Sequence, residues 1–200
     1  NYADALAAAG AYDEAVHWAG KGLEVRERLF DGPHYDVGRS HVTLANALYA
    51  LGRLDEAAGH AREAARHYRH DPGTASTAYA TALHLQAMCA SPGDGVALMR
   101  EAVGILEQLP ERQAASGLAR ARRDLALMEL ATEDRGSALV HAERSVRAEI
   151  ERVYASAHLD TARLKAVAAS ARQAQDVYLQ VLSAGEVEPD EVPRAFSLQM

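Results

Sequence analysis

The chain has 200 residues, of which 48% are hydrophobic and 24% are charged, a balance typical of a globular chain long enough to bury a core. Its abundant alanine and only 6% aromatic residues argue against a β-sandwich or β-barrel. The net charge of −7 argues against direct nucleic-acid binding, and no apolar stretch approaches the roughly 20 residues needed to span a bilayer. Because Cys89 is the only cysteine and no signal peptide is visible, we expect a cytoplasmic protein.

The first predicted elements are two helices that recur further along the chain. Gly10, with Asp13-Glu14-Ala15 after it, matches Gly52, with Asp55-Glu56-Ala57 after it, at an offset of 42 residues. Self-similarity at such a period is typical of helical repeat proteins, in which each repeat is one supersecondary unit. We therefore expect the chain to be built from successive helix pairs.

The second repeat shows how each pair forms. An apolar stripe at helical spacing predicts its first helix and consists of Val42, Leu44, Ala45, Leu48 and Leu51. Gly52 then supplies the residue that adopts a left-handed helix end without a Cβ penalty. Ala57 and Ala64 give the next helix a narrow face for close packing, and Pro72 ends it, since the residue before a proline disfavours the helical conformation.

Proline-containing breaks divide the rest of the chain. The predicted units are residues 1–30, 33–71, 74–109, 111–154 and 157–184, within a helical repeat domain of residues 1–184. Residues 185–200 are acidic and broken by prolines, so we expect a tail or linker there. His34 and His158 recur in register, which predicts the same role at a helix start. A helix pair with small residues on two faces must stack on its neighbours, as in a solenoid.

The repeats resemble those of the tetratricopeptide repeat family. In the second unit the family's large and small positions are occupied by Leu44, Ala45, Leu48, Gly52, Leu54, Ala57 and Ala64. The period exceeds the usual ~34 residues, and the extended second helix over residues 24–30 is similar to the kinesin-light-chain type. The resemblance is closest in residues 1–71 and weakest in residues 72–110. It implies an all-α fold, a right-handed α-solenoid of stacked antiparallel helix pairs.

The residues with catalytic or metal-binding chemistry form no site pattern. His60, His67 and His70 share a predicted helix, but no cysteine or carboxylate stands beside them at zinc-site spacing, so we expect a solvent-exposed Arg/His face. Cys89 lies in an apolar run and is expected to be a small buried hydrophobic residue. With no Gly-rich phosphate loop and no metalloprotease motif, we expect no enzyme, no cofactor and no metal.

The resemblance also implies a binding surface. In tetratricopeptide arrays the first helix of each pair lines a concave groove that holds ligands. Carried over by alignment, the inward positions are Arg39, Asn46, Tyr49, Arg120, Arg123, Leu127 and Arg163. Guanidinium groups recognise carboxylates through paired hydrogen bonds, so we expect one continuous groove for a protein or peptide that is acidic or ends in a carboxylate. The alternative is that Arg120 and Arg123 only coat a solvated helix.

The expected function is therefore a non-catalytic scaffold for protein or peptide binding. Arginine greatly outnumbers lysine, which points to a GC-rich bacterial coding sequence, so we expect a module of a larger bacterial signalling or regulatory protein. Two alternatives are the sensory domain of a peptide-responsive transcription regulator and a regulatory or recruiting appendage of a multidomain kinase or protease. Self-association through an incomplete end repeat stays open, because such an end exposes an apolar face.

Overall fold

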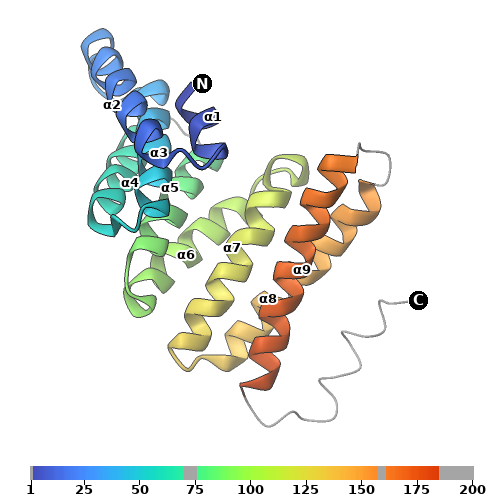
Figure 1. Ribbon diagram of the computed structural model, residues 1–200. Coiled ribbons are helices and arrows are strands. Elements are labelled where there is room, and N and C mark those ends of the chain that lie inside the picture. Colours follow the sequence, from blue (N-terminus) through green and yellow to red (C-terminus); the bar gives the residue numbers. More distant parts are fainter. Residues whose placement is uncertain (1, 70–75, 157–160, 185–200) are drawn as a thin grey trace. The chain divides into compact units, whose positions relative to one another are not determined.

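The computed structural model describes residues 2–69, 76–156 and 161–184, and these residues form α-helices joined by turns and short loops (Figure 1). The chain divides into two compact units, residues 1–110 and residues 111–200. No strand occurs in the ranges just given. The all-α class that the resemblance implies is confirmed.

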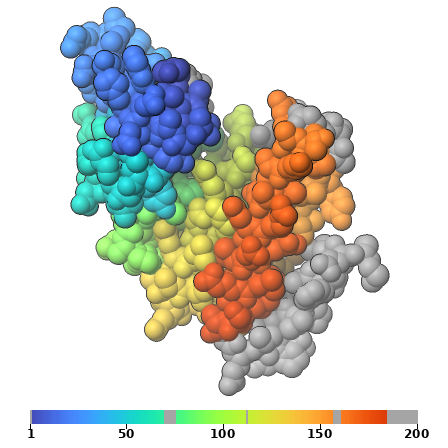
Figure 2. Space-filling view, in the orientation of Figure 1, coloured from blue at the N-terminus to red at the C-terminus, as the bar shows by residue number. Residues whose placement is uncertain are grey.

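The first unit is a series of helix pairs. They are α1 (Tyr2–Ala8) with α2 (Tyr12–Leu29), α3 (Tyr35–Ala50) with α4 (Leu54–Tyr68), and α5 (Ser76–Cys89) with α6 (Pro92–Glu107). Each helix packs against the next one along the chain, and α3 also contacts α1 and α5. In Figure 2 the colours of this unit accordingly run in order, from blue at one end to green at the other. Helices packed in series are the arrangement of an α-solenoid, so the expected fold is confirmed.

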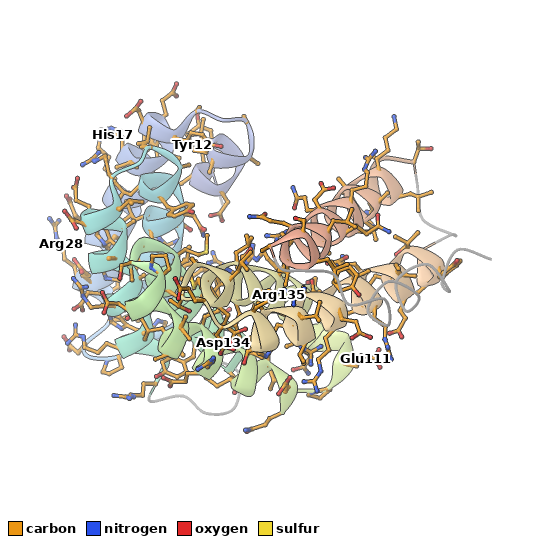
Figure 3. The ribbon with its side chains drawn as sticks, turned by 90° about the horizontal axis from the view of Figure 1, so that it is seen from below. Tyr12, His17, Arg28, Glu111, Asp134 and Arg135 are labelled. Carbon is orange, nitrogen blue, oxygen red and sulfur yellow. The ribbon has the colours of Figure 1, made fainter. Side chains whose placement is uncertain are left out.

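The second unit packs three long helices together. They are α7 (Glu111–Ala131), α8 (Arg135–Ala155) and α9 (Thr161–Ser183). α8 contacts both of the others, and α7 also contacts α9. At the α7–α8 turn, labelled in Figure 3, the Arg135 guanidinium donates to the carbonyls of Val181 and Leu182 at 3.3 Å each. This contact ties the start of α8 to the end of α9, where the last carbonyls lack partners within the helix.

The turn within a pair has the same geometry in both units. At the end of α3 the Arg53 N–H donates to the Leu48 carbonyl at 2.9 Å, and Gly52 has a φ of +74°. The same closing bond ends α1, where Gly10 has a φ of +80°. It also ends α7, but there the left-handed residue is Glu133, with a φ of +65°. The repeat therefore keeps the turn even where it has lost the glycine.

Alanines on α4 let the neighbouring helices approach closely. Ala57, Ala61 and Ala64 have no exposed surface. Ala57 lies in one core cluster with Leu48 of α3, whereas Ala64 lies in another with Ala82 of α5. The α3–α4 pair therefore shares its core with the next pair, as a solenoid requires. The expected burial of Ala57 and Ala64 is confirmed.

The loop before α3 shows how that helix starts. His34 is its N-terminal cap, because the Asp36 N–H donates to its Nδ1 at 3.1 Å. His158, for which the same role was predicted, and the predicted tail of residues 185–200 lie outside the described residues. Among the helices that are described, none is both long and apolar enough to cross a membrane.

Candidate functional site

One face of α3 carries the candidate residues of the first unit. Arg39 and Asn46 are seven residues apart, which places them on the same side of a helix, and both are exposed. Tyr49 is half-buried and packs against the core cluster that contains Leu44. α3 therefore has an exposed polar side, which carries Arg39 and Asn46, and a buried side that packs into the core.

A carboxylate of this chain already lies beside Arg39. The Thr43 hydroxyl donates to Asp4 Oδ1 of α1 at 2.7 Å. Burial raises the pKa of Asp4, but this hydrogen bond and nearby positive charge, including that of Arg39, hold it below its ordinary value. Asp4 is thus an anion at neutral pH, and its negative charge partly neutralises the positive charge of Arg39.

The candidate residues on α7 lie on one face but differ in surroundings. Arg120 is exposed, and Leu127 is half-buried against the core of the second unit. Arg123 has only 17% of its side chain exposed, and its Nη2 lies 2.9 Å from Asp124 Oδ1. Its Nη1 also donates to Gln173 Oε1 of α9 at 2.8 Å. Arg123 therefore links two helices rather than coating a solvated one.

Arg163 is exposed near the start of α9. It precedes Gln173 by ten residues, which is about 15 Å along a helix axis. The contact that Arg123 makes with α9, at Gln173, is therefore well separated along the helix axis from Arg163. The candidates of the first unit lie together on α3, and Arg120 and Arg123 lie together on α7. That all seven candidates face one continuous groove stays a prediction.

A cluster of histidines lies between α3 and α4. His41 Nδ1 is 2.9 Å from His60 Nδ1, and the ring centroid of His67 is 5.7 Å from that of His41. The His34 N–H donates to His67 Nδ1 at 3.0 Å. Burial lowers the pKa of His41 to about 4, and the neighbouring His60 and His67 add to this effect. Burial likewise lowers the pKa values of His60 and His67, so the rings are neutral at neutral pH.

The expectation of a solvent-exposed Arg/His face on α4 was wrong for two of its histidines. His67 is buried and His60 is half-buried, because His41 of α3 covers them. His70 lies outside the described residues. Spacing along one helix could not reveal a partner on another helix. Within the described part of the chain, no group of three or more His, Cys, Asp or Glu side chains is arranged to hold a metal ion.

Cys89 behaves as a structural residue. It is half-buried and packs against the core cluster of the first unit. Burial raises the pKa of its thiol, which disfavours the thiolate that a nucleophile would need. The expected role as a small hydrophobic residue agrees with this environment.

Comparisons with known proteins extend the fold assignment. Residues 1–70 match the tetratricopeptide repeat family. Two solved structures are similar in fold, both of nearly identical TPR-like repeats from Podosopora anserina assigned to a kinesin light chain, one of them a single-substitution variant. Their TM-scores are 0.63 for the variant and 0.62 for the other. Each is 18% identical to this chain, with 92% of this chain and 91% of the other covered.

None of the curated proteins matches the chain. The expected resemblance to tetratricopeptide repeats of the kinesin-light-chain type is nevertheless confirmed by the family match and by the two structures.

Proposed function

We propose, from the match of residues 1–70 to the tetratricopeptide repeat family, that the chain is a non-catalytic scaffold that binds a protein or peptide. Tetratricopeptide repeats are protein-interaction scaffolds in general, and their stacked helices offer extended surfaces for binding. The observation that carries the proposal is the exposed pair Arg39 and Asn46, on a helix whose opposite face is core.

The chemistry of this pair favours an acidic segment or a free carboxylate. A guanidinium donates two parallel hydrogen bonds to a carboxylate, and an amide adds a further donor. Both side chains stand on a packed helix, so little ordering cost falls on the scaffold. In the second unit Arg123 already bonds to Asp124 and Gln173, so the proposal rests on the pair of residues on α3 alone.

The wider setting that we propose is a larger bacterial signalling or regulatory protein of which this chain is a module. The excess of arginine over lysine supports the bacterial assignment. The resemblance to kinesin-light-chain repeats supports the proposed role in a signalling or regulatory protein. A scaffold of this kind would bring a partner to a neighbouring domain without chemistry of its own.

Selection of peptides by the intact chain from a random display library tests the ligand chemistry. We expect the selected peptides to be rich in Asp and Glu or to depend on their free C-terminal carboxylate. Their affinity should fall with added salt, because the contacts are ionic. Light scattering on the same sample distinguishes peptide binding from self-association. Selection of apolar peptides, with affinities that do not depend on salt, would contradict the proposal.

Substitutions on α3 test the location. Arg39→Ala should weaken binding of a selected peptide by roughly 1–3 kcal/mol, the range for hydrogen bonds to charged groups. The matched control is Arg53→Ala, since Arg53 is exposed at the α3–α4 turn and pairs with Glu56 at 2.7 Å. The control should bind like the unsubstituted chain. Equal losses in the two variants would show that overall charge, not this face, holds the peptide.

A further inference from the structure

A separate surface of the first unit, formed by α4, α5 and α6, contains a cavity of about 340 Å³. None of the seven groove candidates lines it, so it is distinct from the surface proposed above. Its walls are unlike each other. α4 supplies positive charge, and α5 and α6 supply apolar side chains, a hydroxyl, an amide and the carboxylate of Glu101.

The wall from α4 carries three arginines. Arg62, Arg66 and Arg69 follow one another at spacings of four and three residues, so they share one helix face, and all three are exposed. Arg66 is paired with Glu63, whose Oε2 lies 2.6 Å from its Nη2. Arg62 makes no hydrogen bond or ion pair with another residue of the described ranges. Its guanidinium donors are therefore open to a ligand.

The opposite wall combines apolar surface with polar groups. Tyr79, Leu83 and Gln86 of α5 line the cavity at the same helical spacing, and Leu98 of α6 adds a second leucine. The Tyr79 hydroxyl donates to Glu101 Oε1 at 3.2 Å. Burial, and next the charge of Glu101, raise the pKa of Tyr79, so its hydroxyl stays protonated. This wall can hold the body of a ligand whose charged end lies on α4.

The charge balance of the cavity selects an anion. Its lining has three guanidinium groups and a single carboxylate, that of Glu101, in a chain whose net charge is −7. One arginine is enough to hold a carboxylate in the paired geometry. A phosphomonoester carries nearly two negative charges and three acceptor oxygens, which suits several guanidinium groups along one helix.

We propose that this cavity binds a phosphomonoester attached to an aromatic or apolar body, with the phosphate on the arginines of α4 and the body on Leu83 and Leu98. The phosphate can belong to a small molecule or to a phosphorylated tyrosine of a protein. The two sources share this chemistry and differ in the contacts made beyond the cavity. The site does not depend on the binding surface proposed on α3.

Calorimetric titration of the intact chain tests the site with phenyl phosphate, inorganic phosphate and phenol. Phenyl phosphate should bind at least tenfold more tightly than inorganic phosphate, because only it reaches the leucines, and phenol should not bind. A phosphotyrosine peptide that binds more tightly still supports a protein source, and equal affinity supports a small molecule. Absence of phenyl phosphate binding, or equal binding of inorganic phosphate, would overturn the proposal.

Two variants with opposite expected effects separate recognition from folding. The double substitution Arg62→Gln and Arg69→Gln should weaken phenyl phosphate binding at least tenfold. Glu101→Gln should strengthen it several-fold, because it removes the negative charge that faces the phosphate. A misfolded variant could not gain affinity, so a loss in Glu101→Gln would overturn the assignment.

The control Arg39→Gln distinguishes this site from the proposed groove. It should weaken acidic-peptide binding and leave phenyl phosphate binding unchanged. If Arg39→Gln weakened the binding of both ligands equally, a separate site on α4 would be contradicted. This conclusion does not depend on whether the surface proposed on α3 is correct.

Discussion

His41 occupies a buried position where a charge would be costly. It is only 5% exposed, and its contact with His60 requires one Nδ1 to donate and the other to accept. Protonation of both rings would bring two donors together. Two carboxylates face this charge, Glu27 of α2, which is 3.9 Å from His41 Nε2, and Glu63 of α4, whereas Arg66 adds to the repulsion. Burial therefore favours the neutral imidazoles in this cluster.

This arrangement predicts that acid destabilises the first unit. The pKa of His41 is about 4 in the folded chain and 6.5 ordinarily, so below pH 6.5 the unfolded chain binds a proton that the folded chain does not. The free energy of unfolding should fall as the pH decreases from 6.5 to about 4, by roughly 3 kcal/mol from this residue. Urea unfolding at several pH values measures the slope.

The variant His41→Gln provides the comparison, because glutamine keeps a hydrogen-bonding group but does not titrate. Its unfolding free energy should depend less on pH across the same range. Equal pH dependence in the variant and the unsubstituted chain would contradict the role given to His41.

Glu133 is a residue with unfavourable backbone geometry. Its φ of +65° falls in the region that glycine adopts freely and other residues avoid. Glu133→Gly should therefore stabilise the chain by about 1 kcal/mol, and Gly52→Ala should destabilise it by a similar amount. A Cβ at Gly52 would meet no atom within 4 Å, so only the backbone is affected. Thermal unfolding of both variants checks the pair, and a lower melting temperature for Glu133→Gly would contradict the shared turn.

Among the elements, α4 depends most on small side chains. Ala57 is fully buried in the cluster with Leu44 and Leu48, so Ala57→Leu should overpack this contact and cost about 1–3 kcal/mol. Ala50 is exposed on α3, and Ala50→Leu serves as the control with little expected effect. Thermal unfolding measures both. An unchanged melting temperature for Ala57→Leu would show that the repeat register is wrong.

The helices were predictable where local residues specify them. Gly52 marks the α3–α4 turn, and the alanines after it mark a close packing face, because both signals act within a few residues. The α7–α8 turn was harder to recognise, since Glu133 replaces the glycine and only the backbone keeps the left-handed conformation. A sequence pattern reports the usual residue at a turn, whereas the fold can hold an unusual one there.

In the candidate site, the residues that share one helix face were predictable, as the helices were. A shared face for Arg39 and Asn46 follows from the period of one helix. The partners of other residues do not follow in this way: Gln173 lies 50 residues from Arg123, and His41 lies 19 residues from His60. The arginine cavity on α4 was missed because its opposite wall comes from α5 and α6.

At the scale of the whole molecule, an acidic chain offers positive charge at defined places. Its net charge of −7 repels acidic molecules, and exposed arginines on α3 and α4 attract them locally. Ligand binding by this chain should therefore be selective for anions, dependent on salt, and confined to those faces.

Mapping of backbone chemical shifts during titration with a selected acidic peptide locates the surface that binds the peptide. We expect the largest shifts along the face of α3 between Arg39 and Asn46, and smaller shifts when salt is added. Resonances of α3 that stay unchanged while those of another helix shift would contradict the binding surface proposed on α3, even if the peptide binds tightly.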